Sequence, residues 1–197
     1  DVDNTDSEIT KAITGNTPGG KIAASINNDL LTLDYQDDQN GIVAITLTGT
    51  SNGLTVDTSF TVTINAVNDV AAATVQTVSA DEDTDKKITL AGTDADGDSL
   101  TYNITTLPSN GTLFQTNDGT TKGNTITSVP TTVSDTSYRV IYLSAQDSNG
   151  DGHGNFGFKV NDGSTDSEEA TVIVNVAKVN DAVIAVSQVV NVNEDIN

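Results

Sequence analysis

Aspartates alternate along one short stretch of the chain. Asp94, Asp96 and Asp98 are each separated by one residue, and Gly97 allows the backbone to turn. Three unpaired carboxylates this close repel one another unless a cation joins them, and calcium is a hard cation that takes oxygen ligands. The alternative is an Asp-Gly turn on a solvated loop. We favour a calcium site, because other acidic clusters accompany this one.

Those other clusters occupy segments that a β-sandwich could bring to its two ends. Asn68 and Asp69 lie in a joint before a run of strands, and Asp162 follows an apolar strand, so both could meet the alternating aspartates at one end. At the opposite end we expect four further acidic or amide residues: Glu82, Asp83, Asn180 and Asp181.

A different calcium signal lies in residues 147–151. Asp147, Asn149 and Asp151 occupy the first, third and fifth positions of an EF-hand loop, with a turning glycine at the sixth. The twelfth position is Phe158, which belongs to a predicted strand, so a helix-loop-helix is excluded. We interpret the segment as an independent loop-type calcium site, with a flexible Gly-rich turn as the alternative.

The clusters recur because the chain repeats itself. The tripeptide 67–69 returns at 179–181, and the acidic triplet 81–83 returns at the same spacing as 193–195. An alternating apolar strand precedes each joint. The sequence therefore predicts three parts: a partial repeat at 1–69 without its first strands, a complete repeat at 70–181, and the first strand of a third repeat at 182–197.

Within the complete repeat the predicted strands are short, rich in Thr, Val and Ile, and separated by Gly, Asn and Asp turns. Asn110-Gly111 predicts a hairpin between two of them. Phe156, Phe158 and Val160 alternate with polar or small residues, which predicts one face in a core. The predicted strands are 74–79, 87–91, 100–105, 112–115, 125–129, 138–143, 156–160 and 170–177.

Composition excludes several classes of function. The chain has 28 Asp and Glu against 8 Lys and Arg, a net charge of -20, so nucleic acid and anionic membranes are poor partners. No apolar run approaches the roughly 20 residues that span a bilayer, so no membrane insertion is expected. Cys, Met and Trp are absent, which excludes disulfides and thiol chemistry. An acidic start without Met indicates an internal segment of a longer protein.

In their order and spacing these residues resemble the cadherin repeat and its bacterial cadherin-like, Ig-like relatives in large secreted calcium-dependent surface adhesins. The resemblance implies an all-β fold of tandem Greek-key β-sandwiches arranged end to end, outside the cell or on its surface. It implies calcium shared between adjacent repeats of the same chain. Its implied ligands are Asn68, Asp69, Asp94, Asp96 and Asp162 at one joint, and Glu82, Asn180 and Asp181 at the next.

Two departures from the family pattern weaken parts of this expectation. Asn52-Gly53 stands in the first repeat where the counterpart of Asp162-Gly163 is expected, so an amide replaces a carboxylate. The middle Asp-Arg-Glu motif of animal cadherins has no evident match. Because of these departures we expect one or two calcium ions at each joint rather than three.

Three functions fit this sequence. The first is a structural extender whose joints calcium stiffens. The second is a filament subunit that self-associates when the terminal strand 183–192 of one copy fills the place of a strand absent from 1–69. The third is a calcium-dependent carbohydrate-binding module, which needs an exposed aromatic near residues 147–151, where Tyr142 and Phe156 look like core residues. No enzyme is expected, because the lone His153 sits between glycines and sugar-binding Trp is absent.

Overall fold

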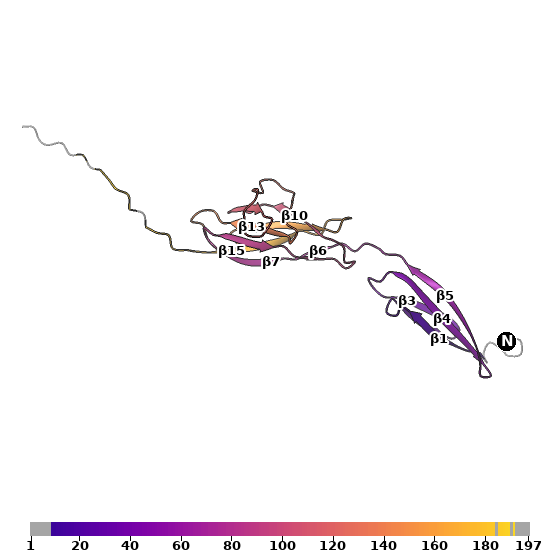
Figure 1. The fold of residues 1–197 in the computed structure, drawn as a ribbon. Helices are drawn as coiled ribbons and strands as arrows, with labels where there is room; N and C mark the ends of the chain where they lie inside the picture. The colour runs from indigo at the N-terminus through magenta and orange to yellow at the C-terminus, as the bar shows by residue number, and fades with distance from the viewer. Residues whose placement is uncertain (1–8, 184, 190, 192–197) are drawn as a thin grey trace, which may run out of the picture. The chain divides into compact units, whose positions relative to one another are not determined.

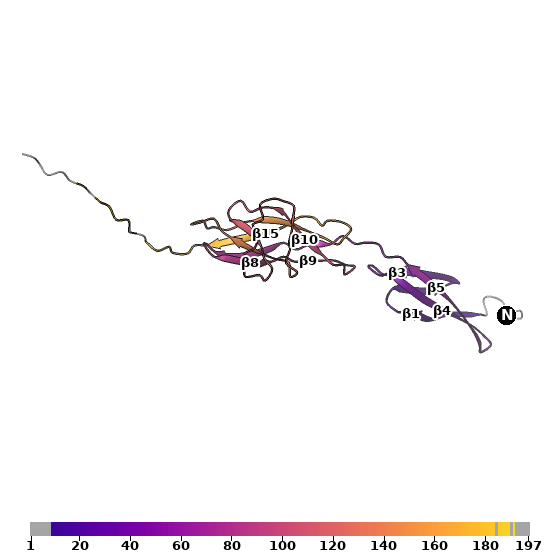
Figure 2. The same cartoon turned by 45° about the horizontal axis from the view of Figure 1, so that its top comes forward.

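The chain is built from strands and loops. A computed structural model describes residues 9–183, 185–189 and 191 (Figure 1). The described residues form two compact units, one within 1–70 together with 94–98 and one within 71–93 together with 99–197. Figure 2 gives a second view of the strands in each unit. In the described part of the chain no helix is suited to crossing a bilayer. The predicted all-β class is confirmed.

The first unit packs a three-stranded sheet against a two-stranded one. Its strands are β1 (Thr10–Thr17), β2 (Ile22–Asn27), β3 (Leu30–Tyr35), β4 (Gly41–Ser51) and β5 (Leu54–Ile64). The sheets run β1-β4-β5 and β2-β3, and all their pairs are antiparallel. Asn52 and Gly53 join β4 to β5 with φ angles of 49° and 79°, as a two-residue type I′ hairpin turn requires.

The second unit has two larger sheets and a short two-stranded one. The sheets run β12-β10-β14-β15-β7, β11-β13-β8 and β6-β9. Most pairs are antiparallel, but β7 pairs in parallel with β15. The strands are β6 (Ala72–Ala73), β7 (Gln76–Asp81), β8 (Asp85–Thr89), β9 (Gly92–Thr93), β10 (Thr101–Thr106), β11 (Thr112–Gln115), β12 (Thr131–Thr132), β13 (Arg139–Leu143), β14 (Phe156–Asn161) and β15 (Ala170–Ala177).

The two cores differ in extent. In the second unit Phe156, Phe158 and Val160 are at most 1% exposed, which confirms the predicted core face of β14. Side chains from most of the other strands of that unit join them. In the first unit the fully buried apolar core consists of Ile22, Val43 and Ile45, with half-buried neighbours around it.

The predicted strand at 125–129 is wrong. Thr125 forms one isolated bridge to Phe114, and the Ile126 N–H donates to the Leu113 carbonyl at 2.8 Å, but no strand is assigned between there and β12. Pro130 follows this segment and has no backbone N–H to donate, which disfavours a continued ladder.

The predicted hairpin at Asn110-Gly111 is also wrong. β10 pairs with β12 and β14, whereas β11 pairs with β13, so this turn carries the chain from one sheet to another. The hydroxyl of Tyr142 donates a hydrogen bond of 2.5 Å to the Asn110 carbonyl. This hydrogen bond attaches the turn to the second sheet. A two-residue hairpin would instead have kept both strands in one sheet.

Parts of the predicted repeat fall on residues whose structure is not described. The predicted terminal strand 183–192 includes 184, 190 and 192, which lie outside the described residues, and the described remainder is not assigned to a strand. The acidic opening 1–4 and the triplet 193–195 also lie outside them.

Candidate functional site

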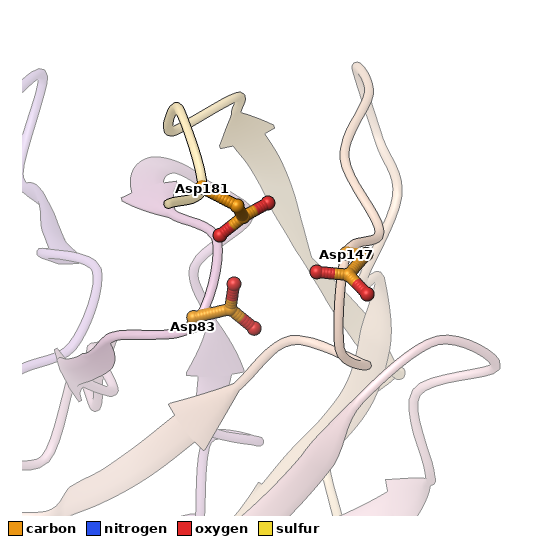
Figure 3. Close-up of side chains that lie close together, drawn as sticks. All are labelled: Asp83, Asp147 and Asp181. Carbon is orange, nitrogen blue, oxygen red and sulfur yellow. The ribbon is translucent and has the colours of Figure 1, made fainter. Parts of the chain in front are cut away.

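Three carboxylates from distant parts of the sequence meet in the second unit. One oxygen from each of Asp83, Asp147 and Asp181 lies within 4.8 Å of the others, and all three residues are exposed. Figure 3 shows the carboxylates directed toward a common space from three separate segments. The donors are all oxygen atoms, the ligand type that calcium prefers.

Local backbone geometry directs two of these side chains. Asp83 lies in the turn between β7 and β8 with φ of 58°, and Asp147 follows β13 with φ of 53°. Aspartate tolerates this left-handed conformation better than most residues. The backbone N–H of Asp83 donates to the hydroxyl of Ser144 at 3.2 Å, which ties the turn to the segment after β13.

Glu82 connects two of the three segments through hydrogen bonds to its buried carboxylate. It is 1% exposed, and its carboxylate accepts hydrogen bonds from the Asn149 amide at 2.8 Å and the Val179 N–H at 2.7 Å. These bonds lower the pKa of the Glu82 carboxyl below its ordinary value, the Asn149 bond having the larger effect. Glu82 therefore fixes the loop that carries Asp147 against the linker that carries Asp181.

The loop at 147–151 contributes one residue to this cluster, and the loop is attached to β15 by hydrogen bonds. Gly150 exchanges backbone hydrogen bonds of 2.9 Å with Val176, and Gly152 donates to the Asn175 side chain at 2.8 Å. The loop is thus attached to β15. Asp147 joins Asp83 and Asp181, while Asp151 is exposed and belongs to no cluster found among the described residues. The geometry places Asp147 and Asn149 with residues of the predicted second joint.

A second cluster consists of the alternating aspartates of the first unit. Oxygens of Asp94, Asp96 and Asp98 lie within 4.8 Å of one another. The Asp98 N–H donates to Oδ1 of Asp94 at 2.9 Å, with Gly97 at φ of 79° between them. Oδ2 of Asp94 is shielded from solvent and has no hydrogen-bond partner within the described ranges. A cation would satisfy this buried oxygen, so the residues fit calcium.

The joint residue Asp69 connects to this cluster. Its backbone N–H donates to Oδ2 of Asp96 at 2.8 Å. Partial burial raises the pKa of the Asp69 carboxyl, and the nearby charges of Asp38, Asp96 and Asp94 raise it further. Asp38, Asp69 and Asp96 also line a cavity of about 270 Å³. A bound cation would relieve this crowding of acids.

Asp38 is an acid that sequence reasoning missed. It has φ of 55° and lies in the loop between β3 and β4, much as Asp147 lies between β13 and β14. A partial signal was available: Gln36-Asp37-Asp38-Gln39 resembles Gln146-Asp147-Ser148-Asn149 in sequence and in position between strands, although not at the spacing that relates the two joints, and Asp37 is the residue that aligns with Asp147.

The remaining predicted ligands form hydrogen bonds with residues near them in the sequence. The Asn68 amide donates to the Asp69 carbonyl at 3.2 Å, and Asn180 repeats this contact with Asp181 at 3.3 Å. Asp162 is 7% exposed, and its Oδ1 accepts from the N–H groups of residues 164 and 165 at 2.7 and 2.8 Å. The Asp162 carboxylate thus stabilises its own turn.

Comparisons with known proteins agree with this architecture. Human mucin-like protocadherin EC1-2 is 17% identical with a TM-score of 0.50, over 87% of this chain and 85% of that one. The extracellular cadherin domains 1-5 of protocadherin gamma B2 are 15% identical with a TM-score of 0.50, over 88% and 34%. At these identities the likeness concerns the fold alone.

An endo-fucoidan hydrolase from glycoside hydrolase family 107 is 18% identical with a TM-score of 0.40. The match covers 88% of this chain but only 24% of the hydrolase. No curated protein sequence matches the chain. Residues 42–176, more than half of the chain, match the family described as SibA-like, immunoglobulin-like domain. The resemblance to cadherin-like and Ig-like domains is confirmed, and the chain belongs to the SibA-like immunoglobulin-like domain family.

Proposed function

We propose that this chain is a calcium-stiffened extender segment of a secreted or cell-surface adhesin. In this role the β-sandwiches are spacers, and calcium at the end of each repeat limits bending of the linker that follows. The proposed repeats are 1–69, 70–181 and 182–197, and the partners of each are its neighbours in the same chain.

The convergence of Asp83, Asp147 and Asp181 is the observation that carries this proposal. Calcium is bound by six to eight oxygens at roughly 2.3–2.6 Å, from carboxylates, carbonyls and water. Three carboxylates already within 4.8 Å of one another would need only small side-chain movements to share an ion. The net charge of -20 adds a general attraction for divalent cations.

The position of Asp181 explains how binding would stiffen the protein. Asp181 lies in the linker that leaves β15, whereas Asp83 and Asp147 belong to loops attached to the sandwich. An ion held by all three would fasten the linker to the end of its own repeat. Small contacts between domains leave them mobile by default, so such fastening has a mechanical effect.

The carbohydrate-binding alternative gains no support from the aromatic residues nearest the loop. Tyr142 is 0% and Phe156 is 1% exposed, so neither ring can stack on a sugar from its position in the core. The extender is therefore the better supported function.

Solution scattering tests the stiffening. The maximum dimension and flexibility of the chain should be compared in calcium and in chelator, for the wild type and for Asp147→Asn. Asp151→Asn is the matched control, because it removes the same charge from the same loop outside the cluster. We expect calcium to stiffen the wild type and the control but not Asp147→Asn. Identical scattering with and without calcium would contradict the proposal.

A further inference from the structure

The first and last of the longer strands in the second unit lie side by side and run in the same direction. β7 pairs in parallel with β15 over six residue pairs, from Gln76 opposite Val172 to Asp81 opposite Ala177 (Figure 1). The chain enters this unit shortly before β7 and leaves it directly after β15. Tension applied to the two ends of the unit therefore acts on this strand pair.

Parallel pairing decides how such tension acts. A pull on the N-terminal side draws β7 toward its own N-terminus, and a pull on the C-terminal side draws β15 toward its own C-terminus. Because the strands are parallel, these are opposite directions along one axis, and the pair is loaded in shear. The hydrogen bonds of a parallel pair are evenly spaced along it, so they share the load and break together. A pair that is pulled apart from one end opens one hydrogen bond at a time instead.

β15 is also held along its other edge. Residues 156–158 of β14 pair with its first part. Further along, Gly150 exchanges two backbone hydrogen bonds of 2.9 Å with Val176, and the Asn155 side chain accepts one of 3.1 Å from the Val174 N–H. β15 is thus attached to the rest of the unit along its length, whereas β7 is the last strand of its sheet in the described part of the chain. The β7–β15 pair is therefore the contact that tension separates.

Glu82 continues this contact past the end of β7. Its backbone N–H donates to the Ala177 carbonyl at 2.9 Å, and its buried carboxylate accepts from the Val179 N–H at 2.7 Å. Both hydrogen bonds join the segment that follows β7 to the end of β15 or to the residues after it. They lie in line with the strand pair, so they carry the same load.

We propose that the β7–β15 pair, together with Glu82, is a load-bearing clamp that keeps the second unit folded when the protein is pulled from its two ends. This function goes beyond the extender role, because stiffening limits bending of the linker whereas the clamp resists rupture of the sandwich. Unfolding under force is governed by the rate of unfolding rather than by equilibrium stability, so the contacts that separate first set the resistance. The clamp consists of hydrogen bonds and does not depend on calcium.

The direction of pulling tests the clamp, and engineered cysteines can set it because the chain has none of its own. Val70→Cys with Lys178→Cys attaches handles at the two ends of the unit and loads the pair in shear. Thr84→Cys with Lys178→Cys attaches them beyond the adjacent C-terminal ends of β7 and β15, so the pair opens from one end. All three substituted residues are exposed, so no core side chain changes.

Single-molecule force spectroscopy in chelator measures the rupture force in each direction. We expect a several-fold higher force in shear than when the pair opens from one end. Rupture in shear should release roughly 300 Å of chain, because residues 76–177 unfold together at about 3.3 Å per residue. Equal rupture forces in the two directions would overturn the proposal.

Proline substitutions test which hydrogen bonds carry the load. The Glu82 N–H points to β15, and successive N–H groups of a strand alternate between its two edges. The Val78 N–H therefore points to β15 and the Ser79 N–H points away from it. Val78→Pro removes a hydrogen bond of the clamp, and Ser79→Pro is the matched control on the open edge, where proline is tolerated.

In the shear direction we expect Val78→Pro to lower the rupture force and Ser79→Pro to leave it close to that of the wild type. Equal rupture forces for the two variants would contradict a load carried by the β7–β15 hydrogen bonds. If Val78→Pro does not fold, the comparison of pulling directions still decides, because it changes no residue of the clamp. All forces are measured in chelator, so a failure of the proposed calcium function would leave these results unchanged.

Discussion

The two linker aspartates have the same sequence context but different surroundings. Asp69 and Asp181 both follow an asparagine whose amide contacts the next carbonyl. Asp181 lies beside Asp83 and Asp147, above the hydrogen-bonded Glu82. Asp69 lies near Asp38, Asp94 and Asp96, and partial burial together with their charges raises the pKa of its carboxyl. In the second unit β7 both covers the core and leads into Glu82 and Asp83.

The hydrophobic cores also differ, because that of the second unit is more completely buried. β15 is buried along its core face because β7 lies beside it, whereas the core face of β5 is exposed at Phe60. Substitutions confined to one unit should therefore affect the two units differently.

The largest effect is expected from Phe158→Ala. Phe158 is 0% exposed and stacks near Tyr102, with ring centroids 6.2 Å apart. Truncation of a buried Phe costs about 3–5 kcal/mol. Scanning calorimetry should show the transition of the second unit at lower temperature and that of the first unit unchanged. Lys159→Ala is the control on the outward face of β14. Equal shifts of both transitions would show that the units do not unfold separately.

Calcium removal should have the next largest effect. Calcium at one hundred times its dissociation constant stabilises a folded unit by about 2.7 kcal/mol. For a unit of this size that corresponds to roughly 10 °C in melting temperature. Chelator should lower the second transition by this order in calorimetry. If the temperature of the second transition is the same with and without chelator, calcium does not stabilise this unit.

Glu82→Gln should weaken calcium binding without removing one of the three clustered carboxylates. Gln can still accept one of the two hydrogen bonds, but it holds the Asp147 loop and the Asp181 linker less firmly. Loss of a residue that orients metal ligands typically costs about 10–100-fold in affinity. A calcium titration of this variant measures the effect. Unchanged affinity would mean that Glu82 does not position the ligands.

The smallest expected effect is a pH dependence of opposite sign in the two units. The folded-state pKa of Glu82 is lowered from 4.5, so its stabilisation is complete above 4.5 and is lost as the pH falls through the folded value. The folded-state pKa of Asp69 is raised from 3.8, so its destabilisation is complete above the folded value and disappears as the pH falls toward 3.8.

Thermal unfolding in chelator between pH 3 and 7 can separate these contributions. Relative to the wild type, Glu82→Gln should make the second transition less sensitive to acid. Asp69→Asn should stabilise the first unit near neutral pH and have less effect in acid. The same sign for both variants would contradict the contrast between the two joints.

The sequence predicted the fold class and most strands because alternation and turn residues are local signals. β11 and β15 have the predicted bounds. The segment 125–129 had the right residue types but no neighbour to pair with beyond a single bridge, which no local pattern reveals. Asn110-Gly111 looked like a hairpin because its residue types cannot indicate that the next strand joins another sheet.

The candidate site was predictable residue by residue but not as a constellation. Asp83, Asp147 and Asp181 were each selected from the sequence, yet Asp147 was assigned to a separate loop site. Strand pairing across the sandwich brings these loops together, and spacing within one loop carries no information about that. Asp38 was missed because its tetrapeptide does not recur at the spacing that relates the two joints.

Calorimetric titration measures calcium binding at the Asp83, Asp147 and Asp181 cluster. We expect saturable binding to the full chain, clearly weaker binding to Asp181→Asn, and unchanged binding to Asp151→Asn. The two variants lose the same charge, so only the place of the carboxylate distinguishes them. Absence of binding to the wild type, or equal binding to both variants, would contradict calcium at the Asp83, Asp147 and Asp181 cluster.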